Sequence, residues 1–201
     1  MPYNASQKRI LHAALIVIAN HSISGTRMHL IASEAGMSSA NLHYHFKTKE
    51  ELLTALMQDL GRIFSEKRYT ALEDCQDTLE DHLRALFQQK RDQILLEPEY
   101  DQVQLDFWVL GQSDEEIRLK FQRPIRDWRN HLISILRHFR PAITQQRAEL
   151  IAHSMVSMML GGAMQYLGDP SFDLDAYFDL CLDQTLNSIN QSQPVVNDTT
   201  S

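Results

Sequence analysis

The sequence contains little of what turns, sheets and disulfide frameworks require. Its 201 residues include seven glycines, six prolines and two cysteines, and alternating runs rich in Val, Ile and Thr are scarce. The low glycine and proline content and the scarcity of alternating runs favour helices over strands. Cys75 and Cys181 are too few for a framework of several bridges, and no secretory leader precedes them, so we expect reduced thiols in a cytoplasmic protein. The expected fold class is all-α.

Long apolar runs and catalytic motifs are lacking as well. The longest apolar stretch, residues 150–164, is interrupted by polar side chains and is too short to cross a bilayer. The sequence has no phosphate-binding glycine loop, no His-Glu-x-x-His or Cys-x-x-Cys pair and no ordered Ser/His/Asp set. These absences argue against a membrane protein and against an enzyme. We expect neither a cofactor nor a metal ion.

Charge is distributed unevenly along the chain. The net charge is −7, yet the first 49 residues hold five lysines and arginines against one acid, Glu34, a net charge of +4. The remaining residues therefore carry −11. A basic head on an acidic body is expected where the head meets phosphates and the body limits nonspecific adhesion. A chance fluctuation would give the same distribution, so the motifs must decide.

Apolar spacing predicts short helices at the amino-terminal end. A stripe from Leu11 to Ile18 at intervals of three and four residues predicts a helix over residues 6–21. Thr26 is the expected N-cap of a second helix. Gly36 follows that helix directly, where a left-handed C-cap residue is needed.

A third short helix and a longer fourth helix are expected next. Ser38 can cap the third helix, whose Leu42 points inward. Thr48 and Glu51 have the spacing of a capping box, which predicts the start of a fourth helix over residues 49–65. The result is three short helices followed by a long one.

Beyond residue 65 the pattern predicts long amphipathic helices and a polar tail. The helices are expected at residues 78–96, 100–111, 114–138, 145–167 and 174–189. Pro124 should kink its helix or lie near its end. We interpret residues 1–48 as a helix-turn-helix domain and residues 49–190 as a larger helical domain for ligand binding and dimerisation. Helix 49–65 links the two domains, and residues 191–201 form a disordered tail.

The third helix carries the pattern that points to function. A turn at Gly36 between two short helices is the frame in which a second helix enters the major groove of DNA. With Leu42 at the centre of the buried face, steps of about 100° per residue gather a polar set on the opposite face. The set comprises Ala40, Asn41, His43, Tyr44, His45 and Lys47. Such side chains can approach the groove, read base edges and neutralise phosphates.

Two other interpretations fit part of this pattern. A solvated polar face is common on small helical domains, and spacing alone leaves that reading open. Tyr44 weighs against it, because a bulky aromatic beside lysines on an exposed face needs a partner. A metal site at His43 and His45 is the weaker alternative, since residues two apart point about 200° apart on a helix, whereas paired ligands stand three or four apart.

Three runs of the sequence resemble the DNA-binding domain of TetR-type regulators. They are Gly25–Met28, Ile31–Ser38 and Asn41–Leu53, and the resemblance covers about residues 6–55. It implies that the following residues occupy DNA-contact positions: Thr26, Arg27, Ser39, Asn41, His43, Tyr44, His45 and Lys49. His43 stands where such regulators often carry tyrosine, so the base preference at that position is open.

The same resemblance, much looser here, implies that the last two helices of each subunit pack on those of a partner. The residues expected at this dimer interface are Met155, Met159, Gly162, Tyr177, Cys181 and Thr185. Gly161 and Gly162 would let the backbones approach closely, and a monomer core would use the same side chains. A twofold dimer suits a palindromic operator.

Large apolar side chains of the body are candidates for a small-molecule pocket between helices. They are Tyr100, Phe107, Trp108, Trp128, Met158 and Tyr166. A plain hydrophobic core would also use them. No group of charges identifies the ligand, and the aromatic content hints at an apolar or cationic compound.

The sequence therefore predicts a homodimeric regulator of transcription, a repressor that a small-molecule effector releases from a palindromic DNA operator. Ligand in the body would shift helix 49–65 and alter the separation of the two recognition helices, and DNA would have the reciprocal effect. The competing prediction is a helical ligand or lipid carrier with this architecture that does not bind DNA. The basic face of the third helix argues against a carrier.

Overall fold

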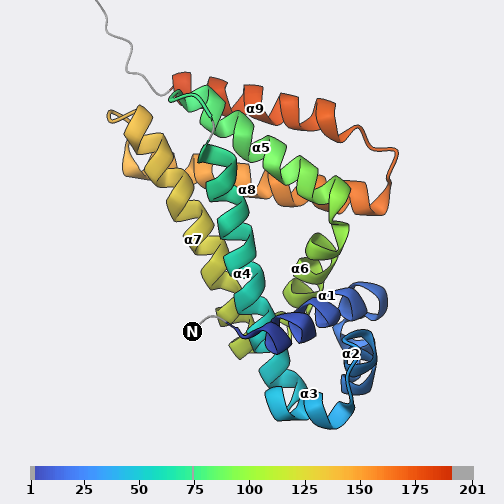
Figure 1. Ribbon diagram of the computed structural model, residues 1–201. Coiled ribbons are helices and arrows are strands. Elements are labelled where there is room, and N and C mark those ends of the chain that lie inside the picture. The colour runs from blue at the N-terminus through green and yellow to red at the C-terminus, as the bar shows by residue number, and fades with distance from the viewer. Residues whose placement is uncertain (1–2, 74, 192–201) are drawn as a thin grey trace, which may run out of the picture. The chain divides into compact units, whose positions relative to one another are not determined.

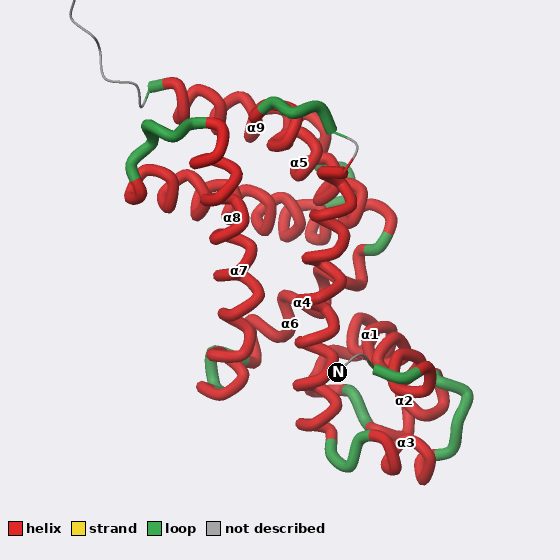
Figure 2. Tube along the Cα trace, turned by 60° about the vertical axis from the view of Figure 1, so that its left-hand side comes forward, coloured by secondary structure: helices red, strands yellow, loops and turns green. Residues whose placement is uncertain are grey.

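A computed structural model describes residues 3–73 and 75–191, and the regular elements in them are all α-helices (Figures 1 and 2). The helices are α1 (Ala5–Gly25), α2 (Met28–Glu34), α3 (Ser39–His45), α4 (Lys49–Glu73), α5 (Leu79–Leu96), α6 (Pro98–Leu110), α7 (Glu115–Phe139), α8 (Gln145–Gly168) and α9 (Leu174–Asn190). This confirms the predicted fold class. Of the predicted tail, only Gln191 is among the described residues. No helix in them is long and apolar enough to span a membrane.

The fourth helix is longer than predicted, and Pro124 lies within a helix. The fourth helix, expected to end at residue 65, continues to Glu73, because residues 62–73 contain no glycine or proline to stop it. Pro124 lies inside α7 and does not end it. Its ring faces Gly61 of α4, where an added Cβ would come within 3.0 Å of the proline Cγ. Gly61 thus leaves the room that the proline ring occupies.

The described residues form two compact units. The first, here called the amino-terminal unit, comprises the residues up to Lys67 together with Gln93–Ile125. The second, the carboxy-terminal unit, comprises Arg68–Asp92 and the residues from Arg126 onward. Helices α4, α5 and α7 therefore each contribute to both units. The domain boundary predicted at residue 48 separates DNA binding from ligand binding. The two units are defined by packing and so leave that boundary a prediction.

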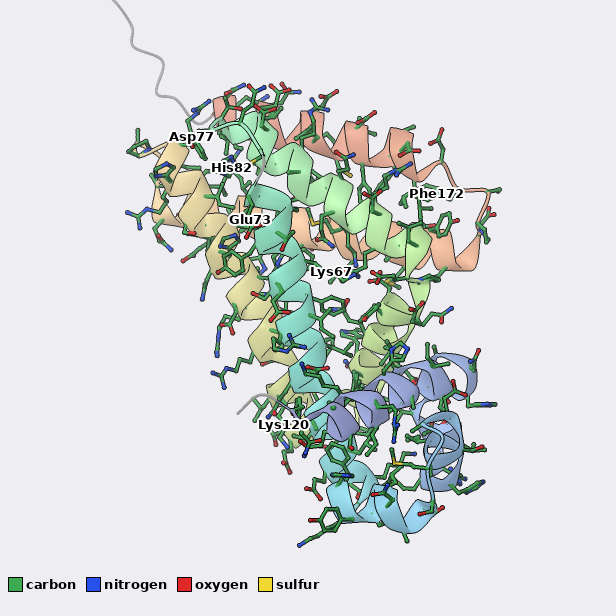
Figure 3. All side chains as sticks on the ribbon, viewed as in Figure 1. Lys67, Glu73, Asp77, His82, Lys120 and Phe172 are labelled. Atoms are coloured by element: carbon green, nitrogen blue, oxygen red, sulfur yellow. The ribbon has the colours of Figure 1, made fainter. Side chains whose placement is uncertain are left out.

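The core of the amino-terminal unit is built around α1, which packs against α2 and α6 (Figure 1). Leu42 of α3 and Phe107 of α6 are fully buried in it. The first turns of α7 are tied to α4 by Lys120, labelled in Figure 3, whose ammonium donates to the Thr54 hydroxyl at 3.2 Å. These contacts join α1, α2 and α6 around one core and hold α7 against α4.

A break in α1 sets the position of the segment that leads to α2. Ser22 has a left-handed backbone with φ of 58°, so regular helical bonding stops there. The backbone N–H of Ile23, just past the break, donates to the carboxylate of Asp106 in α6. A buried N–H group needs such a partner. Asp106 therefore fixes the end of α1 against α6.

In the carboxy-terminal unit, α8 and α9 lie side by side (Figures 1 and 2). Gly162 is what allows their close approach: a Cβ at this position would lie 2.9 Å from Cζ of Phe178 and 3.0 Å from Cε1 of Tyr177. The Tyr177 hydroxyl donates to the carbonyl of Met158 at 3.0 Å. The space that Gly162 leaves is filled by aromatic rings of α9, whereas a close approach of backbones was expected for the glycine pair.

Candidate nucleic-acid interface and ligand sites

The turn between α2 and α3 has the predicted geometry. Gly36 is left-handed with φ of 63°, and the N–H of Met37 donates to the carbonyl of Ala32 at 2.9 Å. The Ser38 hydroxyl accepts from the N–H of Asn41 at 3.2 Å, as a cap of α3 should. These bonds satisfy backbone groups at two helix ends and hold α3 at a fixed angle to α2.

The polar set of α3 lies on one outward face. Ser39, Ala40, Asn41, His43, Tyr44 and Lys47 are exposed, and His45 is half-buried. Tyr44 is 82% exposed, and its ring stands nearly perpendicular to the His45 ring with 5.2 Å between their centres. The carbonyl of Lys47 lies 3.1 Å from Nδ1 of His43. The face thus presents hydrogen-bonding groups, an aromatic ring and a cation together.

Thr26 does not occupy the position expected for it. It is fully buried, and its hydroxyl donates to the carbonyl of Ser22 at 2.7 Å. The N-cap of α2 is Arg27, without a side-chain cap bond, and not Thr26 as predicted. The break at Ser22 turns the threonine inward, so its side chain supports the backbone behind the surface. Arg27 is exposed, and its Nη1 donates to the carbonyl of Ser24 at 2.8 Å.

Lys49 is already hydrogen-bonded within the chain. Its ammonium donates to the carbonyls of Ile23 at 2.5 Å and Thr26 at 2.8 Å. Burial, followed by the charge of Arg27, lowers the pKa of Lys49. The lysine therefore ties the first turn of α4 to the segment after α1. Sequence reasoning missed this tie and the bond from the Ile23 N–H to Asp106, since no local pattern marks contacts between residues so far apart in the sequence.

The start of α4 is capped as predicted. The Thr48 hydroxyl accepts from the N–H of Glu51 at 3.1 Å. The Glu51 carboxylate reaches back to the N–H of Lys47 at 2.8 Å, one residue earlier than a standard capping box. Lys47 is thereby held at the junction of α3 and α4 with its side chain exposed.

The six residues predicted to line a ligand pocket are divided between the two units. Phe107 is buried in the amino-terminal unit, where Tyr100 is half-buried against the ring of Phe64. Trp108 is 54% exposed, which argues against a place in an enclosed pocket. In the carboxy-terminal unit Trp128 is only 7% exposed. Met158 and Tyr166 are half-buried there.

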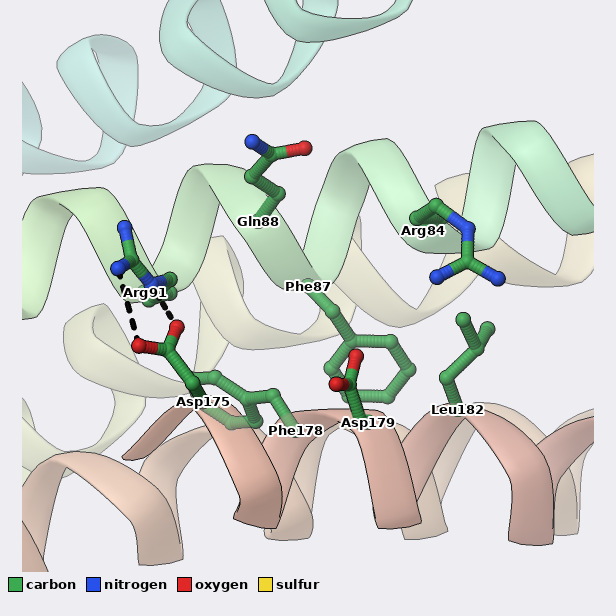
Figure 4. A pocket seen from close by; sticks show the side chains of 8 residues that line it. All are labelled: Arg84, Phe87, Gln88, Arg91, Asp175, Phe178, Asp179 and Leu182. Carbon is green, nitrogen blue, oxygen red and sulfur yellow. Dashed lines mark hydrogen bonds and ion pairs between the residues drawn. The ribbon is translucent and has the colours of Figure 1, made fainter. Parts of the chain in front are cut away.

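Each unit contains a hollow. In the amino-terminal unit an apolar cavity of about 20 Å³ lies among α4, α6 and α7, with Phe107 in its wall. In the carboxy-terminal unit a cavity of about 370 Å³ lies between α5 and α9 (Figure 4). It is lined by Arg84, Phe87, Gln88, Arg91, Asp175, Phe178, Asp179 and Leu182. None of the predicted pocket residues lines this larger cavity. Its lining on α5 and α9 is partly charged, and a charged helix face is interpreted from sequence as solvent-exposed surface.

Most of the predicted dimer residues lie inside the subunit. Met155, Met159, Cys181 and Thr185 are each at most 3% exposed within the single chain, and Gly162 is buried too. Tyr177 is half-buried. Apolar periodicity marked the inner faces of α8 and α9, which pack on each other. The large apolar side chains exposed on these helices are Leu150, Met164 and Leu180, each more than 50% exposed.

The described residues contain no group of three His, Cys, Asp or Glu side chains arranged to hold a metal ion. His43 and His45 both belong to the α3 face, where His45 is in ring contact with Tyr44.

Comparison with known proteins gives consistent results. Residues 10–56 match the model of a family described as bacterial regulatory proteins, tetR family. The HTH-type transcriptional regulator BetI of Rhizobium meliloti is 30% identical over 155 residues, which is 77% of this chain and 74% of that protein.

Two solved structures share the fold over most of their length. A protein of Saccharomonospora viridis in complex with choline has a TM-score of 0.78 at 22% identity, covering 90% of this chain and 95% of its own. The regulator FadR of Bacillus subtilis in complex with stearoyl-CoA has a TM-score of 0.76 at 20% identity, covering 90% and 98%.

Proposed function

This chain belongs to the tetR family of bacterial regulatory proteins and is a DNA-binding transcriptional regulator, and from that premise we propose that it is a homodimeric repressor released from a palindromic operator by a small-molecule effector. The observation that carries the proposal is the outward face of α3. A ring that is 82% exposed beside hydrogen-bonding and basic side chains suits a groove and its phosphates.

The residues of this face have different proposed roles. Asn41 and His43 read base edges, because amide and imidazole groups can pair with the groove edges of bases. Lys47 and Arg27, both exposed, neutralise phosphates. Lys49 acts first as a tie within the chain, so its part in phosphate binding is secondary to its bonds with two carbonyls. Thr26 supports the backbone and makes no side-chain contact with DNA.

The dimer is supported by the exposed apolar side chains of α8 and α9. Leu150 and Met164 on α8 and Leu180 on α9 are the large apolar groups that a partner subunit would cover. A twofold pair of recognition helices matches a palindromic site. Light scattering after gel filtration tests this: Leu180→Glu should shift the mass from two chains toward one, and an unchanged mass would contradict the assignment of this surface.

The proposed effector is a small molecule bound by the helical body. The two structural relatives were solved with choline and stearoyl-CoA, which carry opposite charges. They support a small-molecule effector in the helical body without selecting its chemistry.

The DNA part of the proposal is tested by fluorescence anisotropy with duplex fragments from beside the gene, over a range of salt concentrations. Lys47→Ala should weaken binding to all sequences and reduce the salt slope by about one charge. Arg126→Ala removes an equal charge from an exposed site on α7 and should leave the slope unchanged. Asn41→Ala should alter the preference between sequences by about five- to 150-fold. A dimer without salt-sensitive affinity for any duplex would overturn the proposal and favour the helical carrier.

A further inference from the structure

Arg68, in the carboxy-terminal unit, has a half-buried guanidinium without an anionic partner among the described residues. Its Cζ lies 4.9 Å from the centre of the Trp128 ring, in a cation–π contact. Burial lowers the pKa of Arg68 to about 10. A charge withdrawn from water is costly unless an opposite charge pairs with it, and an aromatic face compensates only part of that cost. The guanidinium can therefore still donate hydrogen bonds to an anion and pair with its charge.

Two further polar atoms beside Arg68 lack partners. Nε1 of Trp128 and Nε2 of His131 are shielded from solvent and have no hydrogen bond within the described part of the chain. Trp128 is 93% buried, since only 7% of it is exposed. These residues lie three apart on α7, so their side chains share a face. Buried polar groups are normally paired, and two unpaired ones on one face indicate a missing partner.

The chemistry of these atoms defines that partner. The indole N–H of Trp128 is only a donor, and the guanidinium is only a donor. Burial, followed by the charges of Arg68 and His82, lowers the pKa of His131, which favours a neutral ring that can donate from Nε2. The Tyr69 ring lies 4.8 Å from the His131 ring, centre to centre, and restrains it. The indole N–H and the guanidinium require an acceptor, and Nε2 of a neutral His131 can donate to the same group. Arg68 requires that the acceptor be negative.

We propose that Arg68, Trp128 and His131 form an anion subsite that binds the carboxylate of a small-molecule effector. This inference rests on the proposed function and supplies the chemical class of its ligand. It also replaces the sequence-based hint of an apolar or cationic compound, because a cation here would meet an arginine that no described carboxylate offsets.

The larger cavity of the same unit does not offer such a site. Its Arg91 is bonded to Asp175 (Figure 4), and its Arg84 is bonded to Glu80 at 2.8 Å. Both arginines thus have carboxylates already. Arg68 differs from them in having an aromatic ring in place of an acid.

The test compares three probes that share an eight-carbon tail and differ in head group: octanoate, octanol and octyltrimethylammonium. Acetate and benzoate are tested as well, because they keep the carboxylate and change the tail. The full chain carries Trp108→Phe, so that emission reports on Trp128 alone; Trp108 is 54% exposed and is the only other tryptophan. Octanoate should bind saturably, change this emission and bind at least about tenfold more tightly than the ammonium compound.

Variants assign the effect to Arg68. Arg68→Met should weaken octanoate binding about tenfold or more and abolish the preference over octanol. Arg68→Lys keeps the charge and should retain the preference at reduced affinity. Arg126→Met, an exposed arginine of the same unit, is the matched control and should bind octanoate as the parent does. Circular dichroism verifies that each variant is folded.

Several outcomes overturn the inference: no saturable binding of any carboxylate, tighter binding of the ammonium compound, or octanoate affinity unchanged in folded Arg68→Met. Duplex binding is measured on the same samples. Intact DNA affinity together with any of these outcomes would leave the proposed regulator standing without this subsite. Octanoate binding that depends on Arg68 but leaves duplex affinity unaltered would retain the subsite and contradict the effector part of the proposed function.

Discussion

The two units of this protein differ in how each holds one half-buried cation, Lys49 in the first and Arg68 in the second. In the amino-terminal unit the ammonium of Lys49 is held by two backbone carbonyls, and the acid Asp106 is held by a backbone N–H. In the carboxy-terminal unit Arg68 meets an aromatic face, and two neighbouring polar atoms have no partner among the described residues. In the first unit both of these charged groups have partners, and the exposed polar groups of the α3 face are the ones proposed to meet DNA. The second contains an incomplete set that a small anion would complete.

The largest effects are expected from truncating one core leucine in each unit. Leu42 in α3 and Leu132 in α7 are both fully buried. Leu42→Ala and Leu132→Ala should each lower the free energy of unfolding by about 2–5 kcal/mol, measured by urea denaturation. The functional losses should differ: Leu42→Ala removes duplex affinity and spares the Trp128 response to octanoate, whereas Leu132→Ala does the reverse. Equal loss of both functions in both variants would mean that the units do not act separately.

The next largest effect separates the two neighbouring lysines. Lys49→Ala should lower the free energy of unfolding by about 2 kcal/mol, because it removes charge-assisted bonds to two carbonyls. Lys47→Ala changes an exposed side chain and should stay within about 0.5 kcal/mol of the parent. Thermal and urea unfolding measure both. If the two variants were equally stable, the tie between α4 and the end of α1 would contribute nothing in solution.

A smaller effect, of opposite sign, is expected at Arg68. Replacing a half-buried arginine that lacks an acid by an apolar side chain of similar length should leave the free energy of unfolding unchanged or raise it by about 1 kcal/mol. Arg68→Met is therefore expected to gain or keep stability while it loses carboxylate binding. A loss of several kcal/mol in urea unfolding would show that the arginine is structural.

The smallest effect is a dependence on pH. Burial, Arg68 and His82 lower the pKa of His131, so the unfolded chain binds a proton that the folded chain resists. Stability should therefore fall as the pH drops below the ordinary histidine pKa, about 6.5, toward the lower folded value. The groups facing this ring are Arg68, His82 and Tyr69. His131→Gln should flatten the profile of melting temperature between about pH 7 and pH 5, and an unaltered profile would assign it to other groups.

The α3 face was predictable because its residues follow one another in sequence and one helical period orders them. The turn at Gly36 and the caps at Ser38 and Thr48 are equally local, and the structure confirms them. Thr26 was misplaced because its orientation depends on the break at Ser22, which no residue pattern announces. The charge of Lys49 suggested phosphates, whereas its carbonyl partners lie more than twenty residues earlier.

The body was less predictable for a physical reason. Apolar spacing in α8 and α9 identifies the faces that are buried, but it does not say whether the same chain or a partner buries them. Met155 and Cys181 were therefore assigned to a dimer and lie inside the subunit. Arg68 and Trp128 are far apart in sequence and lie on different helices. An arginine among the charged residues of α4 is interpreted from sequence as a solvent-exposed side chain. Only the folded structure shows that no acid of the described residues is paired with it.

Ile23 is bonded at both of its backbone polar groups by side chains from other helices: its N–H by Asp106 of α6 and its carbonyl by Lys49 of α4. A displacement of either helix would therefore act on the same residue, shortly before the helix pair that carries the α3 face. Because Ile23 is bonded to two helices, the orientation of α2 and α3 is subject to two coupled restraints that act on this one residue. Without one of these bonds, the other would act alone on Ile23. Changes in duplex affinity caused by removing the Asp106 bond and the Lys49 bond would therefore not simply add.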